Sequence, residues 1–450
     1  MSYVIKEASI VNEGRIIQAD LYIREGIIEK IGQGLQLPNN VTEVYAAGLF
    51  LLPGVIDDQV HFREPGLTHK ADIYTESRAA VAGGVTSFME MPNTVPPAVT
   101  VDLLEEKYAI AAEKSLANYS FYMGVSNDNA EEVLKVNAMK QDVCGVKIFM
   151  GSSTGNMLVN NSLTLEKIFS GTELLIATHC EEETIIKANL EKLKREKGLL
   201  FPYDHPIIRS EEACFESSFK AIQFAKRHNA RLHILHISTQ KELQLFSNML
   251  PLKEKRITAE VCVHHLHFTS EDYDSKKNLI KCNPAIKDPH HREALWEALL
   301  DDRLDVIATD HAPHTWDEKH HTYENAHSGL PLVQHSLLMM LGYVQQKRIS
   351  LEKVVEKMCH AVADCFQVSK RGYIREGYAA DLVLVNLNDT TTVTKENQLY
   401  KCGWSPLEGE SFPACIVSTF VNGHRVFHNP DCGIGTFDES NRGQRLKFNR

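Results

Sequence analysis

The middle of the chain alternates between short apolar runs and longer stretches in which apolar residues recur every three or four positions. Short apolar runs bounded by polar residues are typical of buried strands, and the second spacing predicts amphipathic helices. The predicted strands are residues 51–57, 86–91, 120–125, 145–150, 174–179, 231–237, 257–263 and 306–310. The helical spacing is clearest in residues 73–82, 101–116, 181–194 and 211–228.

This alternation predicts an α/β fold with parallel strands. Eight β–α units over roughly 300 residues match a TIM (β/α)8 barrel. The alternative is an open doubly wound sheet, which usually carries a glycine-rich phosphate-binding turn after its first strand. No such turn follows the first predicted strand here. We therefore expect the barrel.

The two ends of the chain share a different pattern, in which short alternating segments are separated by turns. Residues 12–14 and 25–26 predict hairpins near the N-terminus, and residues 422–423 predict another near the C-terminus. We therefore expect one small β-sandwich domain built from residues 1–52 and 372–450. The barrel would occupy residues 53–371.

Composition narrows the range of functions. The net charge of −11 and the absence of a basic stripe argue against nucleic-acid binding. No apolar run is long enough to span a bilayer, so no membrane partner is expected. The ten cysteines are scattered, and several, such as Cys144, Cys262 and Cys415, lie in apolar runs. We interpret them as reduced core residues of a cytoplasmic protein.

Polar side chains follow the first predicted strand at alternating positions. An apolar run covers residues 49–56, and Gln59, His61 and Arg63 come after it. In an extended backbone alternate residues share a face, so three groups able to bind a metal or an anion would point the same way. Taken alone, this segment is equally consistent with a strand that runs into a polar surface turn.

Other strand ends carry similar chemistry, and functional residues of a TIM barrel lie at those ends. The later strands end near Asn93, Lys147, His179, His236, Asp310 and His314. A single histidine after an apolar run is more often a hydrogen-bonded core residue than a ligand. Here histidine or a carboxylate recurs at the ends of the first, fifth, sixth and eighth predicted strands. This recurrence predicts a divalent metal site with nitrogen and oxygen ligands.

Other histidines near the strand ends are weaker candidates for metal ligands. His264, His265 and His267 follow the seventh strand, and we interpret them as structural because the other strands already supply a full ligand set. His233 lies three positions before His236, so it should point to the other face.

Lys147 is the unusual member, because a free ammonium is repelled by a divalent metal. Its apolar flanks, Val146 and residues 148–150, suggest an inward position where an unmodified lysine is costly. Two alternatives remain. Either the side chain points outward, or CO2 has converted it to a carbamate that acts as an anionic ligand.

These motifs resemble those of the metal-dependent amidohydrolases that open cyclic amides, and within them the dihydroorotases. The resemblance covers nearly the whole chain. The residues that match the family are 61–66 (HFREPG), 91–94 (MPNT), Lys147, His179, His236, 282–284 (CNP) and 309–314 (TDHAPH).

The resemblance implies one or two zinc ions. His61 and Asp310 would hold the more buried ion, His179 and His236 the other, with carbamylated Lys147 as the bridge. Asp310 would also move the proton from the attacking hydroxide to the departing nitrogen.

The resemblance also implies how the substrate is held. Arg63, Asn93 and His314 would bind a substrate carboxylate. Asn283 and the backbone near Gly329 would hold the ureide edge.

Two positions depart from the family pattern. Most members have histidine where this chain has Gln59, and an amide oxygen is a weaker zinc ligand than imidazole. Many dihydroorotases of this length have aspartate where this chain has Lys147, which resembles the hydantoinase arrangement instead.

The activity implied is reversible hydrolysis of L-dihydroorotate to N-carbamoyl-L-aspartate in pyrimidine biosynthesis. The alternatives are an allantoinase or hydantoinase, or a non-catalytic structural homologue. A homo-oligomer is expected, and aspartate transcarbamoylase is a candidate partner.

Overall fold

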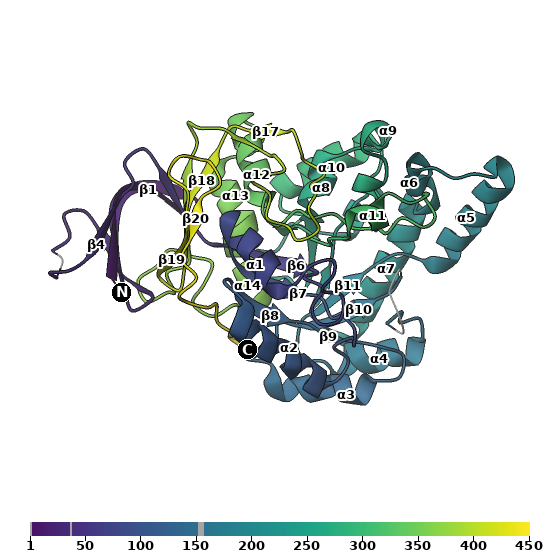
Figure 1. Cartoon of the computed structure of the whole chain (residues 1–450). Helices are drawn as coiled ribbons and strands as arrows, with labels where there is room; N and C mark the ends of the chain where they lie inside the picture. The colour runs from purple at the N-terminus through teal and green to yellow at the C-terminus, as the bar shows by residue number, and fades with distance from the viewer. Residues whose placement is uncertain (1, 37, 152–156) are drawn as a thin grey trace.

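The computed structural model describes residues 2–36, 38–151 and 157–450. Strands from the two ends of the chain lie side by side at one side of the molecule, and helices surround the parallel strands of the middle part (Figure 1). The α/β class with a separate β layer is thus confirmed. No helix among the described residues has both the length and the apolar composition to cross a bilayer.

The parallel strands of the middle part follow one another around a ring. They are β6 (Val55–Val60), β7 (Val85–Glu90), β8 (Asn118–Phe121), β9 (Met123–Gly124), β10 (Val146–Phe149), β11 (Ile176–His179), β12 (Leu232–Ile234), β13 (Ile257–Cys262) and β14 (Val306–Ala308). β6, β7 and β8 pair in that order, as do β9 to β14. β8 and β9 are separated by Tyr122 alone. A parallel bridge between Val60 in β6 and His311, just after β14, joins the last strand to the first. If β8 and β9 are counted as one strand, the paired strands return to β6 after eight positions.

Helices cover this ring where the apolar spacing predicts them. Two agree with the prediction at both ends, namely α1 (Ile73–Ala82) and α7 (Glu211–His228). The Asp72 side chain accepts from Thr75 N in a capping box at the start of α1. Asn229 adopts a left-handed conformation (φ 50°) at the end of α7, as a C-cap often does.

The remaining helices are shorter or differ at their ends. They are α2 (Val101–Lys114), α3 (Ala130–Leu134), α4 (Ser162–Gly171), α5 (Glu183–Lys197), α6 (His205–Ile208), α8 (Val263–His267), α9 (Tyr273–Lys276), α10 (Pro289–Leu300), α11 (Trp316–Lys319), α12 (Ser336–Gln345), α13 (Leu351–Val355) and α14 (Ala361–Phe366). A π-helical turn, Glu356–His360, joins α13 to α14.

The first predicted strand is in fact two strands. β5 (Phe50–Pro53) pairs with β1 and β15 of the β layer, whereas β6 belongs to the ring. Gly54 separates them, and a Cβ there would lie 2.1 Å from Thr86 Oγ1. β6 also continues to Val60, so Asp57, Asp58 and Gln59 lie inside the strand and not after it. Apolarity alone misplaced this end because the carboxylates are buried.

The β layer is one nine-stranded sheet to which both chain ends contribute. The N-terminal strands are β1 (Ser2–Asn12), β2 (Arg15–Arg24), β3 (Ile27–Gly32), β4 (Thr42–Tyr45) and β5; the C-terminal ones are β15 (Leu382–Asn386), β18 (Cys415–Val421), β19 (His424–His428) and β20 (Thr436–Phe437). β16 (Thr391–Thr392) and β17 (Ser411–Phe412) pair separately. The predicted hairpins at residues 12–14, 25–26 and 422–423 are present, each with two successive positive φ angles.

One cysteine prediction is wrong. Cys144 and Cys262 are free and buried, but Cys415 forms a disulfide with Cys432. Cys415 begins β18 and Cys432 follows β19, its antiparallel neighbour, so the hairpin brings the two Cα atoms to 5.7 Å. An apolar run predicts the burial of a thiol but not the partner that a hairpin places beside it.

Candidate functional site

A cavity of about 370 Å³ opens at the carboxyl ends of the parallel strands. The nine residues that the sequence predicts for the site all line it: His61, Arg63, Asn93, Lys147, His179, His236, Asn283, Asp310 and His314. Gln59 and Gly329 line it as well. Residues spread over about 250 positions of the chain thus meet because most of them lie in, or shortly after, the carboxyl-terminal part of a strand of the same ring.

Two imidazoles face each other where β11 and β12 end. His179 Nδ1 lies 3.0 Å from His236 Nε2, and both rings are buried. His179 Nε2 lies 2.9 Å from Glu181 Oε2. Burial opposes ionisation of Glu181, but Arg209 and the His179 hydrogen bond outweigh it and hold the pKa at about 2. The carboxylate can only accept, so His179 Nε2 carries the proton.

This fixes the lone pairs of the two histidines. His179 Nδ1 is then an acceptor, and the proton in the His179–His236 contact belongs to His236 Nε2. His236 Nδ1 is left with a buried lone pair and no hydrogen-bond partner among the described residues. Carboxylate-oriented imidazoles with lone pairs directed into a cavity are the usual setting of a metal ligand.

A second pair of acceptors meets between β6 and β14. His61 Nε2 lies 3.2 Å from Asp310 Oδ1, and His61 Nδ1 lies 2.8 Å from Asn93 Oδ1. Burial lowers the pKa of His61, so the ring is neutral. With its Nδ1 proton donated to Asn93, Nε2 turns a lone pair toward the carboxylate. A metal cation bound between His61 Nε2 and the Asp310 carboxylate would remove this repulsion between two acceptors.

Lys147 belongs to β10 and is buried, with 1% of the residue exposed. Its Nζ lies 4.5 Å from the centre of the Phe149 ring and makes no hydrogen bond or ion pair to any residue that the structure describes. Burial lowers its pKa to about 7. An outward, snorkelling side chain is excluded. A buried amine that is largely neutral above pH 7 has the free lone pair needed to react with CO2.

The opposite wall of the cavity is cationic. Arg63 donates from Nε to the Pro313 carbonyl at 3.0 Å, and its Nη2 lies 3.1 Å from His314 Nε2. Burial lowers the pKa of Arg63 to about 10, which leaves it charged. No described carboxylate lies within ion-pair distance of Arg63, whereas nearby Lys70 is paired with Glu318 at 2.9 Å. A buried cation without a counter-ion favours an anionic ligand.

Three of these site residues have an unusual backbone conformation. Arg63 (φ 67°), His236 (φ 41°) and Asp310 (φ 48°) all have left-handed conformations. Residues other than glycine seldom adopt them, and such strain collects at functional sites.

Sequence reasoning missed the side chains that orient the others. Glu181 lies two positions after His179, and that alternation is a signal that could have revealed it. Arg209, which pairs with Glu181, comes from the segment after α6 and gives no such signal. Lys70, 3.1 Å from His314 Nδ1, likewise depends on a loop conformation.

Two other groups of metal-ligating residues lie outside the cavity lining. Asp58, His233 and Glu260 form one of them, and His233 Nε2 lies 3.3 Å from a carboxylate oxygen of each of the other two. His233 thus points away from His236, as its spacing predicts. Cys262, His264 and His265 form the second group.

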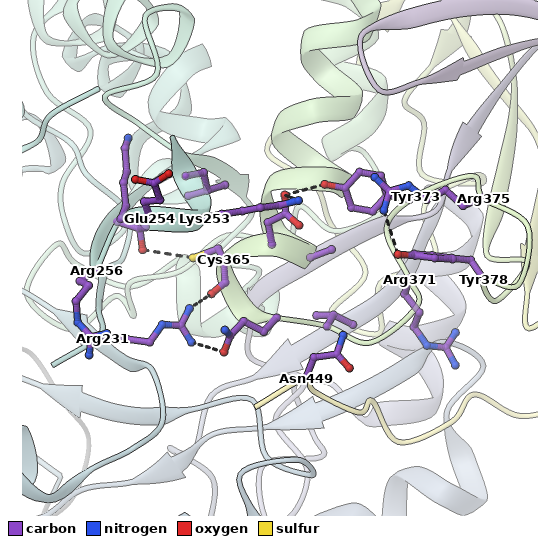
Figure 2. Close-up of a pocket in the computed structure, with 17 residues that line it drawn as sticks. Arg231, Lys253, Glu254, Arg256, Cys365, Arg371, Tyr373, Arg375, Tyr378 and Asn449 are labelled. Carbon is purple, nitrogen blue, oxygen red and sulfur yellow. Dashed lines mark hydrogen bonds and ion pairs between the residues drawn. The ribbon is translucent and has the colours of Figure 1, made fainter. Parts of the chain in front are cut away.

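A different cavity, of about 550 Å³, lies at the amino ends of β12 and β13 (Figure 2). Its lining includes Arg231, Arg256 and Arg375, but none of the nine predicted residues. Arg231 donates to Gln367 and to the Cys365 carbonyl, as the dashed lines in Figure 2 show. This end of such a ring usually serves stability, so the metal-ligand cavity is the candidate site.

Comparison with known proteins assigns the chain to a family. The model of the amidohydrolase family matches residues 50–426, well over half of the chain. The chain belongs to the amidohydrolase family. This amidohydrolase is 31% identical to the dihydroorotase of Pyrococcus abyssi, over 96% of each chain. It is also 31% identical to the allantoinase of Deinococcus radiodurans, over 99% of each chain.

The solved structures agree with this family. The L-hydantoinase of Arthrobacter aurescens superposes with a TM-score of 0.89 and 25% identity, covering 96% of this amidohydrolase and 97% of that chain. The chain is therefore a cyclic-amide hydrolase that acts on a small molecule. The names of the three relatives give different substrates, so the substrate must be argued from the cavity.

Proposed function

We propose that the chain is a dihydroorotase, which interconverts L-dihydroorotate and N-carbamoyl-L-aspartate in pyrimidine biosynthesis. The site would lie at the mouth of a (β/α)8 barrel of residues 53–371. Residues 1–52 and 372–450 would form the accompanying β-sandwich domain.

The observation that carries this proposal is the unpaired guanidinium of Arg63. Dihydroorotate has a ring carboxylate, whereas hydantoin has none. A planar guanidinium offers parallel donors that match the two oxygens of a carboxylate. Asn93 and His314 line the same wall and would complete this subsite.

The donor set fits zinc, as one or two ions. His61 and Asp310 would hold one ion, His179 and His236 the other, and a carbamate on Lys147 would bridge them. Such ions lower the pKa of water to about 7 and polarise a carbonyl. The free lone pair of His236 Nδ1 and the unpaired Lys147 amine support this arrangement.

The protein's own groups would move the proton and hold the ring. Asp310 faces the cavity and would take the proton of the attacking water, then deliver it to the ring nitrogen as the amide C–N bond breaks. Asn283 and the backbone at Gly329 would hold the ureide edge. Gly329 has φ 143°, and a Cβ there would lie 2.3 Å from the Ala312 carbonyl oxygen, so only glycine fits.

Other functions have less support. Allantoinase or hydantoinase activity would leave the Arg63 charge without its carboxylate. A non-catalytic homologue would be supported by Gln59 alone, since the other proposed ligands all line the cavity. A homo-oligomer, and association with aspartate transcarbamoylase, stay predictions.

Replacing Arg63 tests the substrate. We expect Arg63→Met to lower kcat/KM for L-dihydroorotate by roughly 10²- to 10³-fold, mainly through KM, because a buried charge pair is lost. Steady-state kinetics would measure this, with circular dichroism as the check on folding.

Lys70→Met is the matched control. It removes a neighbouring buried cation that is paired with Glu318 and contacts His314, so its effect on kcat/KM should be clearly smaller than that of Arg63→Met. Full activity of Arg63→Met on L-dihydroorotate would refute the carboxylate-binding role.

A further inference from the structure

Three metal-ligating side chains meet at the end of β13, beside the catalytic cavity. Cys262 is the last residue of β13, and His264 and His265 lie in α8. All three are buried, and their ligand atoms lie within 4.8 Å of one another. Cysteine and histidine together are the preferred ligands of zinc. From the sequence we interpret these histidines as structural; both are buried, and only His265 has a well-aligned hydrogen-bond contact with a described residue, to the Pro284 carbonyl.

The two histidines hold buried lone pairs that no described residue satisfies. His265 Nε2 lies 3.1 Å from the Pro284 carbonyl oxygen. A carbonyl only accepts, so Nε2 carries the proton and Nδ1 has the lone pair, without a partner. His264 has no well-aligned hydrogen bond to any described residue, although a backbone group of Thr309 lies beside its ring. A buried polar group without a partner is costly, and a backbone carbonyl that fixes the tautomer is typical of a metal-binding histidine.

Gln59 turns its oxygen toward the same point. Gln59 Nε2 donates to Asp310 Oδ1 at 3.2 Å, which leaves Oε1 facing Cys262 Sγ at 3.8 Å. Two ligand atoms on a tetrahedral zinc ion lie roughly 3.3–3.8 Å apart. The Cys262–Gln59 distance is already at the upper end of that range, and the ligand atoms of Cys262, His264 and His265 lie within 4.8 Å of one another. Because Gln59 lines the cavity, an ion could reach the group through it.

We propose that Cys262, His264 and His265, with Gln59 Oε1, form a binding site for one zinc ion, separate from the ligands proposed for catalysis. Binding would release the thiol proton to solvent and leave a thiolate on the metal. The site would satisfy the orphaned imidazoles. It would also give the amide at position 59 a role that the catalytic set does not supply. The proposal does not depend on which ring the enzyme opens.

Cobalt(II) distinguishes this site from the catalytic one. The catalytic ligands are nitrogen and oxygen, so only a thiolate site produces sulfur-to-cobalt charge-transfer absorption. We expect metal-free protein titrated with cobalt chloride to develop this band, and Cys262→Ser to lose it. Zinc content, measured by mass spectrometry, should fall by one ion per chain in the same variant.

Cys180→Ser is the matched control, because Cys180 is a buried thiol directly after His179. It should keep the band. His264→Asn keeps the thiol and should weaken cobalt binding by roughly 10- to 100-fold, which tests the site even if Cys262→Ser does not fold. No charge-transfer band in the wild type, or a band that survives Cys262→Ser or is lost in Cys180→Ser, would overturn the proposal.

Discussion

Lys147→Ala is expected to lower kcat/KM by about 1,000-fold or more, because an anionic bridge worth several kcal/mol of metal-dependent stabilisation disappears and each 1.4 kcal/mol is tenfold. The side chain is buried, lines the cavity and has no polar partner among the described residues. Alanine keeps the strand and removes the side chain beyond Cβ, including the amine. Added acetate should restore part of the activity by supplying a carboxylate to the vacated space.

Carbamylation itself can be observed directly. Wild-type protein in ¹³C-labelled bicarbonate should show one carbamate resonance, and Lys147→Ala should not. The signal should weaken as the pH falls below about 7, because protonation removes the lone pair that reacts with CO2.

Lys319 is the matched control for this experiment. It is also buried with a pKa lowered by burial to about 7, but its Nζ donates to three carbonyl oxygens, those of Lys281, His327 and Gly329. Lys319→Met should keep the resonance. A resonance that persists in Lys147→Ala would contradict the assignment.

Asp310→Asn is expected to reduce kcat by roughly 10²- to 10⁴-fold, the usual contribution of a positioned acid–base group. Asparagine has the same shape but cannot take a proton from the attacking water. Stopped assays of L-dihydroorotate hydrolysis would measure the loss. Metal content must be measured on the same sample, because Asp310 is also a proposed ligand.

Asp57→Asn separates this effect from general damage. Asp57 is buried in β6, accepts at 2.6 Å from Oγ1 of Thr309, the residue before Asp310, and does not line the cavity. Burial raises its pKa to about 7, so an amide mimics its protonated form. Activity within about tenfold of wild type is expected. Equal losses in both variants would argue against a special role for Asp310.

Most of the site residues could be predicted because they lie at or near the carboxyl end of a strand. His179, His236 and Asp310 end three apolar runs, and in a ring of parallel strands such ends meet. The split at Gly54 could not be predicted, because β5 and β6 form one apolar run and only their partners differ. The Cys415–Cys432 disulfide depends in the same way on a pairing between strands.

The orientation of side chains was the least predictable part. Glu181 and Arg209 fix the His179 tautomer, but they come from the end of β11 and from the segment after α6. His264 and His265 appeared to be ordinary core residues until their missing hydrogen bonds were visible. Sequence patterns place residues on faces, whereas hydrogen-bond satisfaction depends on the assembled structure.

The most direct test of the account compares the turnover of two rings that differ only in the carboxylate. Metal-loaded wild-type protein should hydrolyse L-dihydroorotate with a kcat/KM at least about 100-fold above that for 5,6-dihydrouracil. Only L-dihydroorotate has a carboxylate that can pair with the Arg63 guanidinium. Allantoin and hydantoin should be similarly poor. Equal turnover of the two rings, or none of L-dihydroorotate, would contradict the proposed function.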